Sequence, residues 1–513
     1  MSYVLMLSLK EIALRRVIVV LWSEPDILDS IGKFRNKSVQ QSSKEYQNEW
    51  CVTFENKIAD KMSKLVLPKK LAKQMLHIVR PIGLQILKWK MFHEKYLTDS
   101  REEFDVPVLE KLCWTAASAV DYRKTAEELI RSDVVDIVKR YKLACLYCLE
   151  DYIPALWKEL PQETKNTFYN EKDTSHIERP LLHLCWPYIL KGEESKLDNL
   201  PGRPLLTTFH RYAFGYTVLN GNRAAAEYFF QKLTKEDRES CLIPEAKAAV
   251  RCRNSEIDSY PDEFPLEKLS DVLCYFLSLM NHEQQMQFFK MQPCDYFICF
   301  LDWPWQDLFL EIIALIWDFL PVDSLVHNLI KSFIKSGYYS PKIFQELFML
   351  SPIDFKKRFL LKVYDGAFLP AFFDFYDSET IQVIFRNIDA ADRAQIVFSA
   401  PILRLFYNSI SRGRWRMVRV CLREATLSKK DRERFMEAFI GFLRTNGVQI
   451  KWGIPKWRRF FDFLDETDES VSRKRRLDYE ALTEAIKLRC EIEKRNNQIL
   501  SWLITVTSNH FNQ

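Results

Sequence analysis

Scarce glycine is the feature that most limits what this chain can fold into. Only 12 of its 513 residues are Gly, about 2.3% against the roughly 7% that is usual. Loops that cradle a phosphate need Gly, because their backbone approaches the ligand closely and adopts positive φ angles. No two Gly residues lie two positions apart and no Gly-Lys-Ser/Thr occurs, so the dinucleotide-binding and P-loop signatures are excluded.

Other common catalytic signatures are also missing from the sequence. It contains no Gly-x-Ser-x-Gly elbow, no His-Glu-x-x-His zinc helix and no kinase His-Arg-Asp or Asp-Phe-Gly set. The nearest approach to the zinc helix, His282-Glu283-Gln284-Gln285-Met286, lacks the second His. We therefore predict a protein that is not an enzyme, with no catalytic residues, no cofactor and no metal ligands.

The 12 Cys residues are scattered rather than regularly paired, which is not typical of a disulfide framework. Cys145-Leu-Tyr-Cys148, with His183 and Cys185 downstream, offers two of the four ligands that a zinc ion needs. Both thiols stand in an apolar stretch, however, where Cys usually acts as a small core residue. We expect core packing here, and zinc binding is the alternative.

Nothing in the sequence indicates membrane insertion. The apolar N-terminal stretch is interrupted by Lys10, Glu11, Arg15 and Arg16, whereas a signal peptide needs an unbroken apolar segment. No window reaches the roughly 18 uncharged apolar residues of a spanning helix. We expect a soluble protein of a reducing compartment, in the cytoplasm or the nucleus, without a membrane partner.

Helical periodicity dominates the chain. Hydrophobic residues make up 47% of it, enough for a sizeable core, and strict alternation typical of strands is scarce. Asn-Gly hairpin signals occur only at Asn220-Gly221 and Asn446-Gly447. Apolar residues instead recur at intervals of three and four, as in Leu129, Ile130, Val134, Ile137, Val138 and Tyr141. The sequence therefore predicts an all-α fold.

One local pattern recurs: a polar or Gly turn followed, about five residues later, by an apolar helical face. The starts of its five copies are separated by 100, 60, 96 and 36 residues, which fit three, two, three and one steps of about 33. The copies are Asp121–Ile130, Gly221–Phe230, Asn281–Lys290, Asp377–Arg386 and Gly413–Leu422.

This period resembles a degenerate ankyrin-repeat array over Val106–Phe442. Arg179-Pro-Leu-Leu-His183-Leu is similar to the family's Thr-Pro-Leu-His-x-Ala opening, and Ala213–Asn222 to its first helix and the Gly after it. Most copies lack the Thr-Pro opening and carry aromatics in place of small residues, so a more general helix-pair solenoid fits equally well. The layout also resembles a group of uncharacterised arthropod proteins.

Three regions follow from these patterns. Residues 1–105 are helical but off the period, and we expect them to form an N-terminal helical cap. Residues 106–445 form the stacked helix-pair array, in which each pair must bury its apolar face against its neighbours. Residues 446–513 contain a basic and acidic linker and one long helix, Leu477–Leu503.

Charge is distributed unevenly along the chain. Between Arg404 and Arg459, 15 Lys and Arg stand against four Asp and Glu, a balance of +11 in a chain of net charge +5. Such a stretch favours anions. It could also be a solvated face that pairs with the acidic run Asp462–Glu469. The candidate partner-binding residues are Arg412, Arg414, Arg416, Arg419, Lys456, Arg458 and Arg459.

These observations predict an interaction scaffold or adaptor that presents a repeat surface to a protein partner, and the basic stretch favours an acidic one. The alternative is a protein that binds phosphates or nucleic acid through Arg404–Arg476, since cations and aromatics alternate there. A short basic cluster also resembles a nuclear-localisation signal, with 13 residues between it and Lys456–Arg459. Its members are Arg473, Lys474, Arg475 and Arg476.

Overall fold

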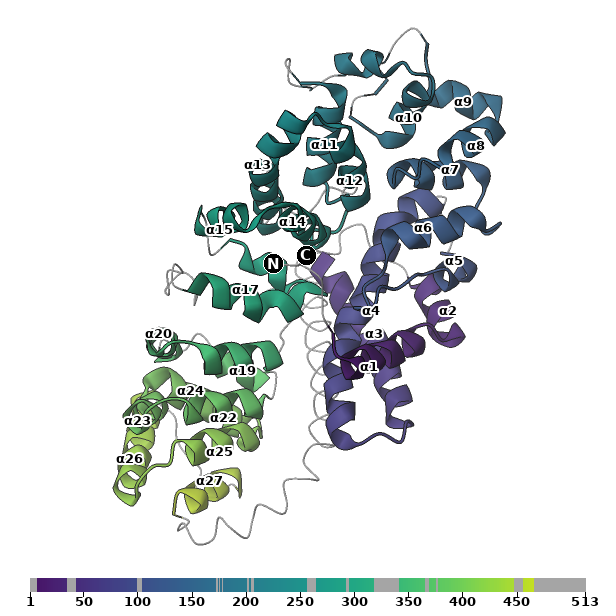
Figure 1. Ribbon diagram of the computed structural model, residues 1–513. Helices are drawn as coiled ribbons and strands as arrows, with labels where there is room; N and C mark the ends of the chain where they lie inside the picture. The colour runs from purple at the N-terminus through teal and green to yellow at the C-terminus, as the bar shows by residue number, and fades with distance from the viewer. Residues whose placement is uncertain are drawn as a thin grey trace, which may run out of the picture. The chain divides into compact units, whose positions relative to one another are not determined.

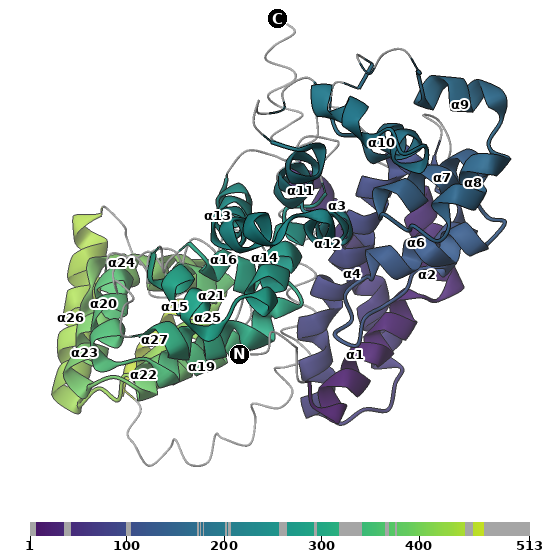
Figure 2. The same ribbon diagram turned by 45° about the horizontal axis from the view of Figure 1, so that its top comes forward.

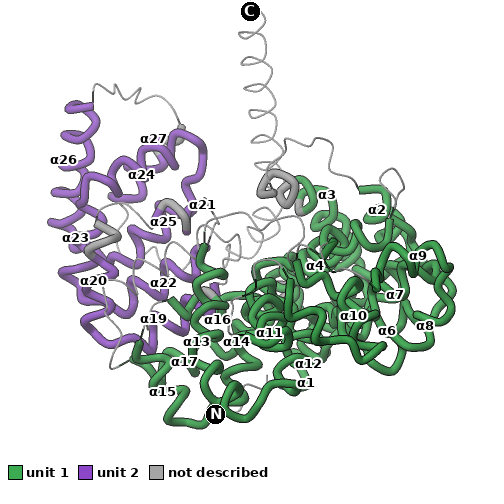
Figure 3. Tube along the Cα trace, turned by 90° about the horizontal axis from the view of Figure 1, so that it is seen from above, with its two compact units in different colours: residues 1–320 green, residues 321–513 purple. Residues whose placement is uncertain are grey.

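The structure, a computed structural model, describes most of the chain and divides it into two units. Unit 1 comprises residues 1–320 and unit 2 residues 321–513 (Figure 3). The division falls inside the range expected to form one array. The described residues are 7–34, 43–98, 104–171, 174, 176–177, 179–200, 203, 207–255, 264–291, 295–317, 341–364, 369–374, 377–446 and 455–465.

Helices account for nearly all of the regular structure in unit 1 (Figure 1). In its described part, the β-type pairing found is one isolated bridge between Trp114 and Val120. The helices are α1 (Leu9–Trp22), α2 (Pro25–Lys33), α3 (Ser43–Ser63), α4 (Lys69–Leu97), α5 (Val106–Glu110), α6 (Tyr122–Arg131), α7 (Ile137–Leu146), α8 (Ile153–Glu159), α9 (Gln162–Phe168), α10 (Leu182–Leu190), η1 (Glu194–Asn199), α11 (Phe209–Leu219), α12 (Arg223–Lys232), α13 (Lys235–Asn254), α14 (Lys268–Leu279), α15 (His282–Met291), α16 (Phe297–Leu301), η2 (Trp305–Leu308) and α17 (Phe309–Ile316).

Unit 2 is helical as well, so the all-α prediction is confirmed. None of the described helices of either unit combines the length and hydropathy needed to cross a bilayer. The helices of unit 2 are α19 (Pro341–Leu350), α20 (Ile353–Tyr364), α21 (Leu369–Asp374), α22 (Ser378–Arg386), α23 (Ala390–Phe398), α24 (Ala400–Ser411), α25 (Trp415–Glu424), α26 (Lys429–Thr445) and α27 (Pro455–Asp465).

Each of the five recurrent sequence segments contains one helix that starts just after the turn residue. These helices are α6, α12, α15, α22 and α25. In four of them the residue before the helix is Asp or Asn, and its side chain accepts a hydrogen bond from the backbone N–H three residues on, which satisfies a group that the helix leaves unpaired. The four capping residues are Asp121, Asn222, Asn281 and Asp377.

Left-handed turns end several of the preceding helices. At the end of α11, Gly221 has φ +74° and its N–H donates to Val218 O at 3.1 Å, while the N–H of Asn222 donates to Thr217 O at 2.9 Å. This pair of bonds is the Schellman motif, which favours Gly because a side chain strains a positive φ angle. The motif recurs at Gly192 and Gly413.

In unit 1, α4 packs against a segment almost two hundred residues further along the chain. The ring centroids of Phe92 on α4 and Phe264 lie 4.0 Å apart. Lys88, also on α4, forms an ion pair with Glu267, and both side chains are largely buried. The N-terminal helices therefore contact distant parts of unit 1 as well as the helices that follow them.

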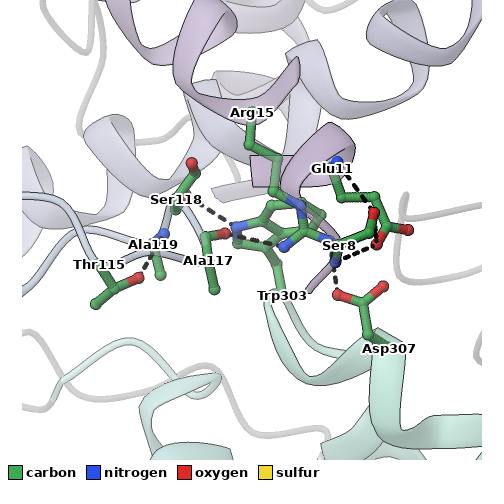
Figure 4. A network of polar contacts seen from close by, with 9 residues as sticks. All are labelled: Ser8, Glu11, Arg15, Thr115, Ala117, Ser118, Ala119, Trp303 and Asp307. Atoms are coloured by element: carbon green, nitrogen blue, oxygen red, sulfur yellow. Dashed lines mark hydrogen bonds and ion pairs between the residues drawn. The ribbon is translucent and has the colours of Figure 1, made fainter. Parts of the chain in front are cut away.

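A second distant contact joins α1 to the last third of unit 1 (Figure 4). The guanidinium of Arg15, only 5% exposed, donates to Ala117 O at 3.0 Å and to the Asp307 carboxylate at 2.6 Å. It also lies 4.4 Å from the ring centroid of Trp303, whose indole N–H donates to Ser118 O at 3.0 Å. These bonds fasten α1, the turn after α5 and the segment before α17 together.

Beside this contact lies a buried ion pair. Arg253, at the end of α13, donates two hydrogen bonds of 2.6 Å to the carboxylate of Asp302. Ser270 on α14 donates a third bond of 2.6 Å to the same carboxylate, which is 1% exposed. Three hydrogen bonds compensate the cost of burying this charge.

Unit 2 is more regular than unit 1. Its helices α19, α22 and α25 begin at residues 341, 378 and 415, a spacing of 37 residues, and α20, α23 and α26 begin at 353, 390 and 429. Helix α22 contacts both α19 and α25, and α23 contacts both α20 and α26. Figure 1 shows the first set stacked side by side, and Figure 2 shows α20, α23 and α26 along one edge.

Candidate functional site

The two units differ in charge. Residues 321–513 hold 32 Lys and Arg against 23 Asp and Glu, a net charge of +9. Residues 1–320 hold 42 Lys and Arg against 46 Asp and Glu, a net charge of −4. The predicted partner-binding residues therefore belong to the unit that carries the positive charge.

Helix α24 separates a buried apolar face from an arginine face. Ile402, Leu403 and Phe406 are buried, whereas Arg404 and Arg412 are exposed. Residues 404, 408 and 412 are all exposed and lie at intervals of four, so they share one side of the helix. Arg412, a predicted site residue, is thus on the solvent side.

The other predicted arginines lie at the start of α25 and are half-buried. Arg414 precedes the helix, and Arg416 and Arg419 lie on it at a spacing of three. The opposite side of α25 faces the core through Met417 and Cys421, among others. These three side chains are therefore less accessible to a partner than that of Arg412.

Helix α26 adds cations that the sequence reasoning did not single out. Lys429 and Lys430 are exposed in its first turn, and Arg434 and Arg444 are exposed further along. Its core face is formed by Phe435, Phe439 and Leu443. We call the exposed cations of this region the α24–α26 basic residues: Arg404, Arg412, Lys429, Lys430, Arg434 and Arg444.

The exposure of these additional cations could have been predicted from the spacing of the apolar residues in α26. Within α26, the three core residues are spaced four apart at 435, 439 and 443. This buried face determines which of the other residues of the helix point away from the core. Residues 430, 434 and 444 fall outside that apolar stripe. The net charge of Arg404–Arg459 does not show which helix face each residue occupies, so exposed and half-buried arginines count equally in it.

The acidic residues of the same region are partly engaged. Glu424 accepts two hydrogen bonds from Arg386 of α22, at 2.7 and 2.8 Å, and this contact holds the pKa of Arg386 above its ordinary value. Asp431 accepts from the capping Ser428 at 2.6 Å and lies 3.6 Å from Arg434. These pairings leave an excess of exposed positive charge on α24 and α26.

The aromatic residues that alternate with cations near Arg459 serve the core. Trp457, Phe460 and Phe461 of α27 are all buried, and Phe460 is 0% exposed. The ring of Trp457 stacks on Tyr407 with centroids 5.8 Å apart. Because their faces are occupied, these rings are not available to stack on nucleic acid bases.

Several predicted residues fall outside what the structure describes. Arg459 is exposed on α27, but the side chains of Lys456 and Arg458 lie outside the described part. The localisation cluster Arg473, Lys474, Arg475 and Arg476 and the helix expected over Leu477–Leu503 also lie outside it.

The buried titratable groups of unit 1 have structural partners. His93 contacts Trp89 O through Nδ1 at 2.8 Å and the Tyr147 hydroxyl through Nε2 at 2.7 Å, and its burial lowers its pKa to about 3. An imidazole with this pKa stays neutral at physiological pH. It positions α4 against the end of α7.

The Cys145-x-x-Cys148 motif lies in the core of unit 1. Burial raises the pKa of both thiols and of Cys185, so they remain protonated at neutral pH, whereas zinc binds the thiolate. Among the described residues, no group of three or more His, Cys, Asp or Glu side chains is placed to hold a metal ion.

Comparison with known proteins adds no relative. No protein-family model matches the chain, and no curated protein matches it.

Proposed function

We propose that the protein is a non-enzymatic interaction scaffold whose second unit binds an acidic segment of a protein partner. The observation that carries the proposal is the set of α24–α26 basic residues, which face solvent while the opposite sides of their helices form the core. The 37-residue spacing of α19, α22 and α25 supports a stacked-repeat arrangement behind that surface.

An acidic protein segment fits this surface better than nucleic acid does. Binding single-stranded nucleic acid without sequence preference combines cations with aromatic faces that stack on bases. In α27, by contrast, Trp457, Phe460 and Phe461 are buried, and the half-buried Phe463 packs edge-on against Trp415. Carboxylates need only the exposed guanidinium and ammonium groups. Binding to the phosphates or bases of nucleic acid through Arg404–Arg476 remains the alternative.

The test uses the full chain and two fluorescent probes of similar length, an acidic peptide rich in Glu and a single-stranded oligonucleotide. The variant replaces Arg404, Arg412, Arg434 and Arg444 by Glu. A matched control makes the same change of charge in unit 1 at four exposed residues, Lys158, Lys235, Arg238 and Arg251. Fluorescence anisotropy at low and high salt measures each affinity.

We expect the wild type to bind the peptide with a salt-dependent affinity. The variant should lose at least about tenfold of that affinity, because four charges change sign, whereas the control should stay within about twofold. If the oligonucleotide binds more tightly than the peptide, the alternative function replaces this one. Equal losses in variant and control would show that only net charge matters, and the proposed surface would be wrong.

A further inference from the structure

A second, smaller basic region lies in unit 1, at the turn between α3 and α4. This α3–α4 turn comprises residues Lys64 to Pro68. Val66 is 103% exposed, the most exposed of the large apolar side chains in the described chain, and Leu65 is 36% exposed. A helix–helix turn normally carries polar residues, so a fully exposed Val at its tip needs an explanation.

In the sequence, lysines flank this apolar tip on both sides. Between residues 57 and 73 the sequence contains six Lys and a single acidic residue, Asp60. Two of the lysines have partners within unit 1: Lys57 donates to Ser30 at 3.0 Å, and Lys61 pairs with both Glu24 and Asp26. The remaining four lie closest to the tip in sequence. Lys64 is exposed in the turn, and the side chains of Lys69, Lys70 and Lys73 lie outside the described part of the chain.

The helices on either side of the turn are packed into the core of unit 1. Helices α3 and α4 contact each other and α1. The indole N–H of Trp22 on α1 donates to Val79 O on α4 at 3.2 Å, and its ring stacks on Trp50 of α3 with centroids 6.2 Å apart. The α3–α4 turn is therefore held in place by the core, and its exposed residues are presented without a large ordering cost.

We propose that the α3–α4 turn docks on the surface of an anionic lipid bilayer. Val66 and Leu65 enter the boundary between headgroups and acyl chains, and the flanking lysines meet lipid phosphates and carboxylates. Stable attachment of a protein to a membrane surface generally needs two signals, such as an apolar insertion and a basic patch. This turn supplies both, and a surface contact needs no spanning helix.

A lipid surface fits the turn better than a protein partner does. A stable protein interface buries about 800 Å² on each side, and the apolar tip here consists of two side chains on a helix–helix turn. A few inserted residues are enough for a bilayer when charge assists them. Unit 1 has a net charge of −4, so an isolated basic turn would also orient unit 1 on an anionic surface.

The experiment measures co-sedimentation of the full chain with vesicles of phosphatidylcholine alone and of phosphatidylcholine mixed with phosphatidylserine. One variant replaces Lys64, Lys69 and Lys70 by Glu. Glu near the start of α4 suits the helix dipole, so the fold should be kept. The second variant, Val66→Ser, changes only the exposed tip.

A matched control makes the same change of charge elsewhere in unit 1, with the exposed residues Lys158, Lys235 and Arg238 replaced by Glu. None of them belongs to the α3–α4 turn or to the α24–α26 basic residues, so this proposal and the proposed function are tested on separate residues. Either one can fail while the other stands.

We expect the wild type to sediment with the anionic vesicles and to be released by salt. The lysine variant should partition at least about tenfold less, Val66→Ser about fivefold less, and the control as the wild type does. Three results would overturn the proposal: binding no stronger to anionic than to neutral vesicles, an equal loss in the control, or unchanged binding of Val66→Ser. The last result would identify a general polyanion site that uses the lysines alone.

Discussion

The two units reach the same helical content by different patterns of contact. In unit 1, Arg15 bonds to Asp307, and Trp303 bonds to Ser118, so residues 292 and 185 positions apart meet. In unit 2, three polar contacts join residues 33 to 38 positions apart: Gln345 with Thr380, Arg386 with Glu424, and Arg393 with Thr426 in the turn after α25.

The two patterns of contact predict different responses to a mutation, because they determine how many helices lose stability when one contact is removed. When each element contacts only its neighbours, stability is close to a sum of local terms and a defect stays local. When the first helix is fastened to residues near the end of a unit, loss of that contact affects many helices together.

The largest effect is expected for Phe460→Ala in unit 2. The Phe460 ring is fully buried and lies within 6.5 Å, centroid to centroid, of five other rings, including those of Trp415 and Phe439. Truncating it should lower the free energy of unfolding by about 3–5 kcal/mol. Hydrogen exchange should rise in α25–α27 but not in α19 and α20. An equal rise of hydrogen exchange in α19 would contradict the idea that each helix of unit 2 is stabilised mainly by its neighbours.

Arg15→Ala in unit 1 is expected to cost about 2–4 kcal/mol, because it removes an ion pair and leaves a buried carbonyl unpaired. Hydrogen exchange should rise in α1, around residues 115–120 and around residues 303–307. The neighbouring Arg16 is exposed, and Arg16→Ala is the matched control with an expected change below about 0.5 kcal/mol. A purely local response in α1 would remove the distinction between the units.

Acid should weaken unit 1 through its buried imidazoles. Burial lowers the pKa of His93 to about 3 and of His183 to about 4 in the folded chain, against about 6.5 when unfolded. As the pH falls below 6.5, the unfolded chain takes up protons that the folded chain cannot, so stability falls. For His93 alone the loss is up to about 1.4 kcal/mol per pH unit between pH 6.5 and 3.

The described part of unit 2 contains no His, so unit 1 should lose protection first when exchange is followed from pH 7 to 5. His93→Gln offers similar hydrogen-bonding groups without a titrating proton, and it should flatten the pH dependence of unit 1. An unchanged slope in this variant would assign the acid sensitivity to other groups.

Asn222→Ala should lower the free energy of unfolding by about 1–2 kcal/mol. Asn222 caps α12 by accepting from Ala225 N at 3.2 Å, and it donates to Leu146 O at the end of α7 at 2.8 Å. The loss combines a cap with an unpaired carbonyl. In unit 2, Ser428 caps α26 at an exposed site, and Ser428→Ala should cost about half as much in denaturant unfolding. Equal costs would show that the link to α7 contributes nothing.

The smallest effect is expected for Arg386→Ala. Its bidentate contact with Glu424 joins α22 to α25, but the Arg386 side chain is 62% exposed. Exposed ion pairs contribute up to about 1 kcal/mol and are weakened by salt. A loss above about 2 kcal/mol in the same unfolding assay would mean that this contact matters as much to unit 2 as Arg15 does to unit 1.

Local features of the fold were readable from the sequence because they depend on nearby residues. Asp121, Asn222, Asn281 and Asp377 were placed at the starts of recurrent segments, and each caps a helix. A cap and the apolar face behind it span only about ten residues, so they leave a direct pattern. The all-α class follows from many such segments.

The distant contacts left no comparable pattern. Nothing in the residues around Arg15 distinguishes it from the exposed Arg16, since the partners of Arg15 are nearly 300 positions away. In the candidate site, Arg412 is exposed, whereas the alternation of cations with Trp457 and Phe460 reflects a core face of α27. The α3–α4 turn was missed because charge was summed over long stretches.

The bond between Arg15 and Asp307 also has a consequence while the protein is being made. At translation rates of about 5–20 residues per second, the 292 residues that separate them take about 15–60 seconds to emerge from the ribosome. Helix α1 finds Trp50 and Val79 early, but the groups that neutralise Arg15 arrive last. In unit 2, Glu424 follows Arg386 within about 2–8 seconds at the same rates. We therefore expect the nascent first unit to need chaperones more than the second does.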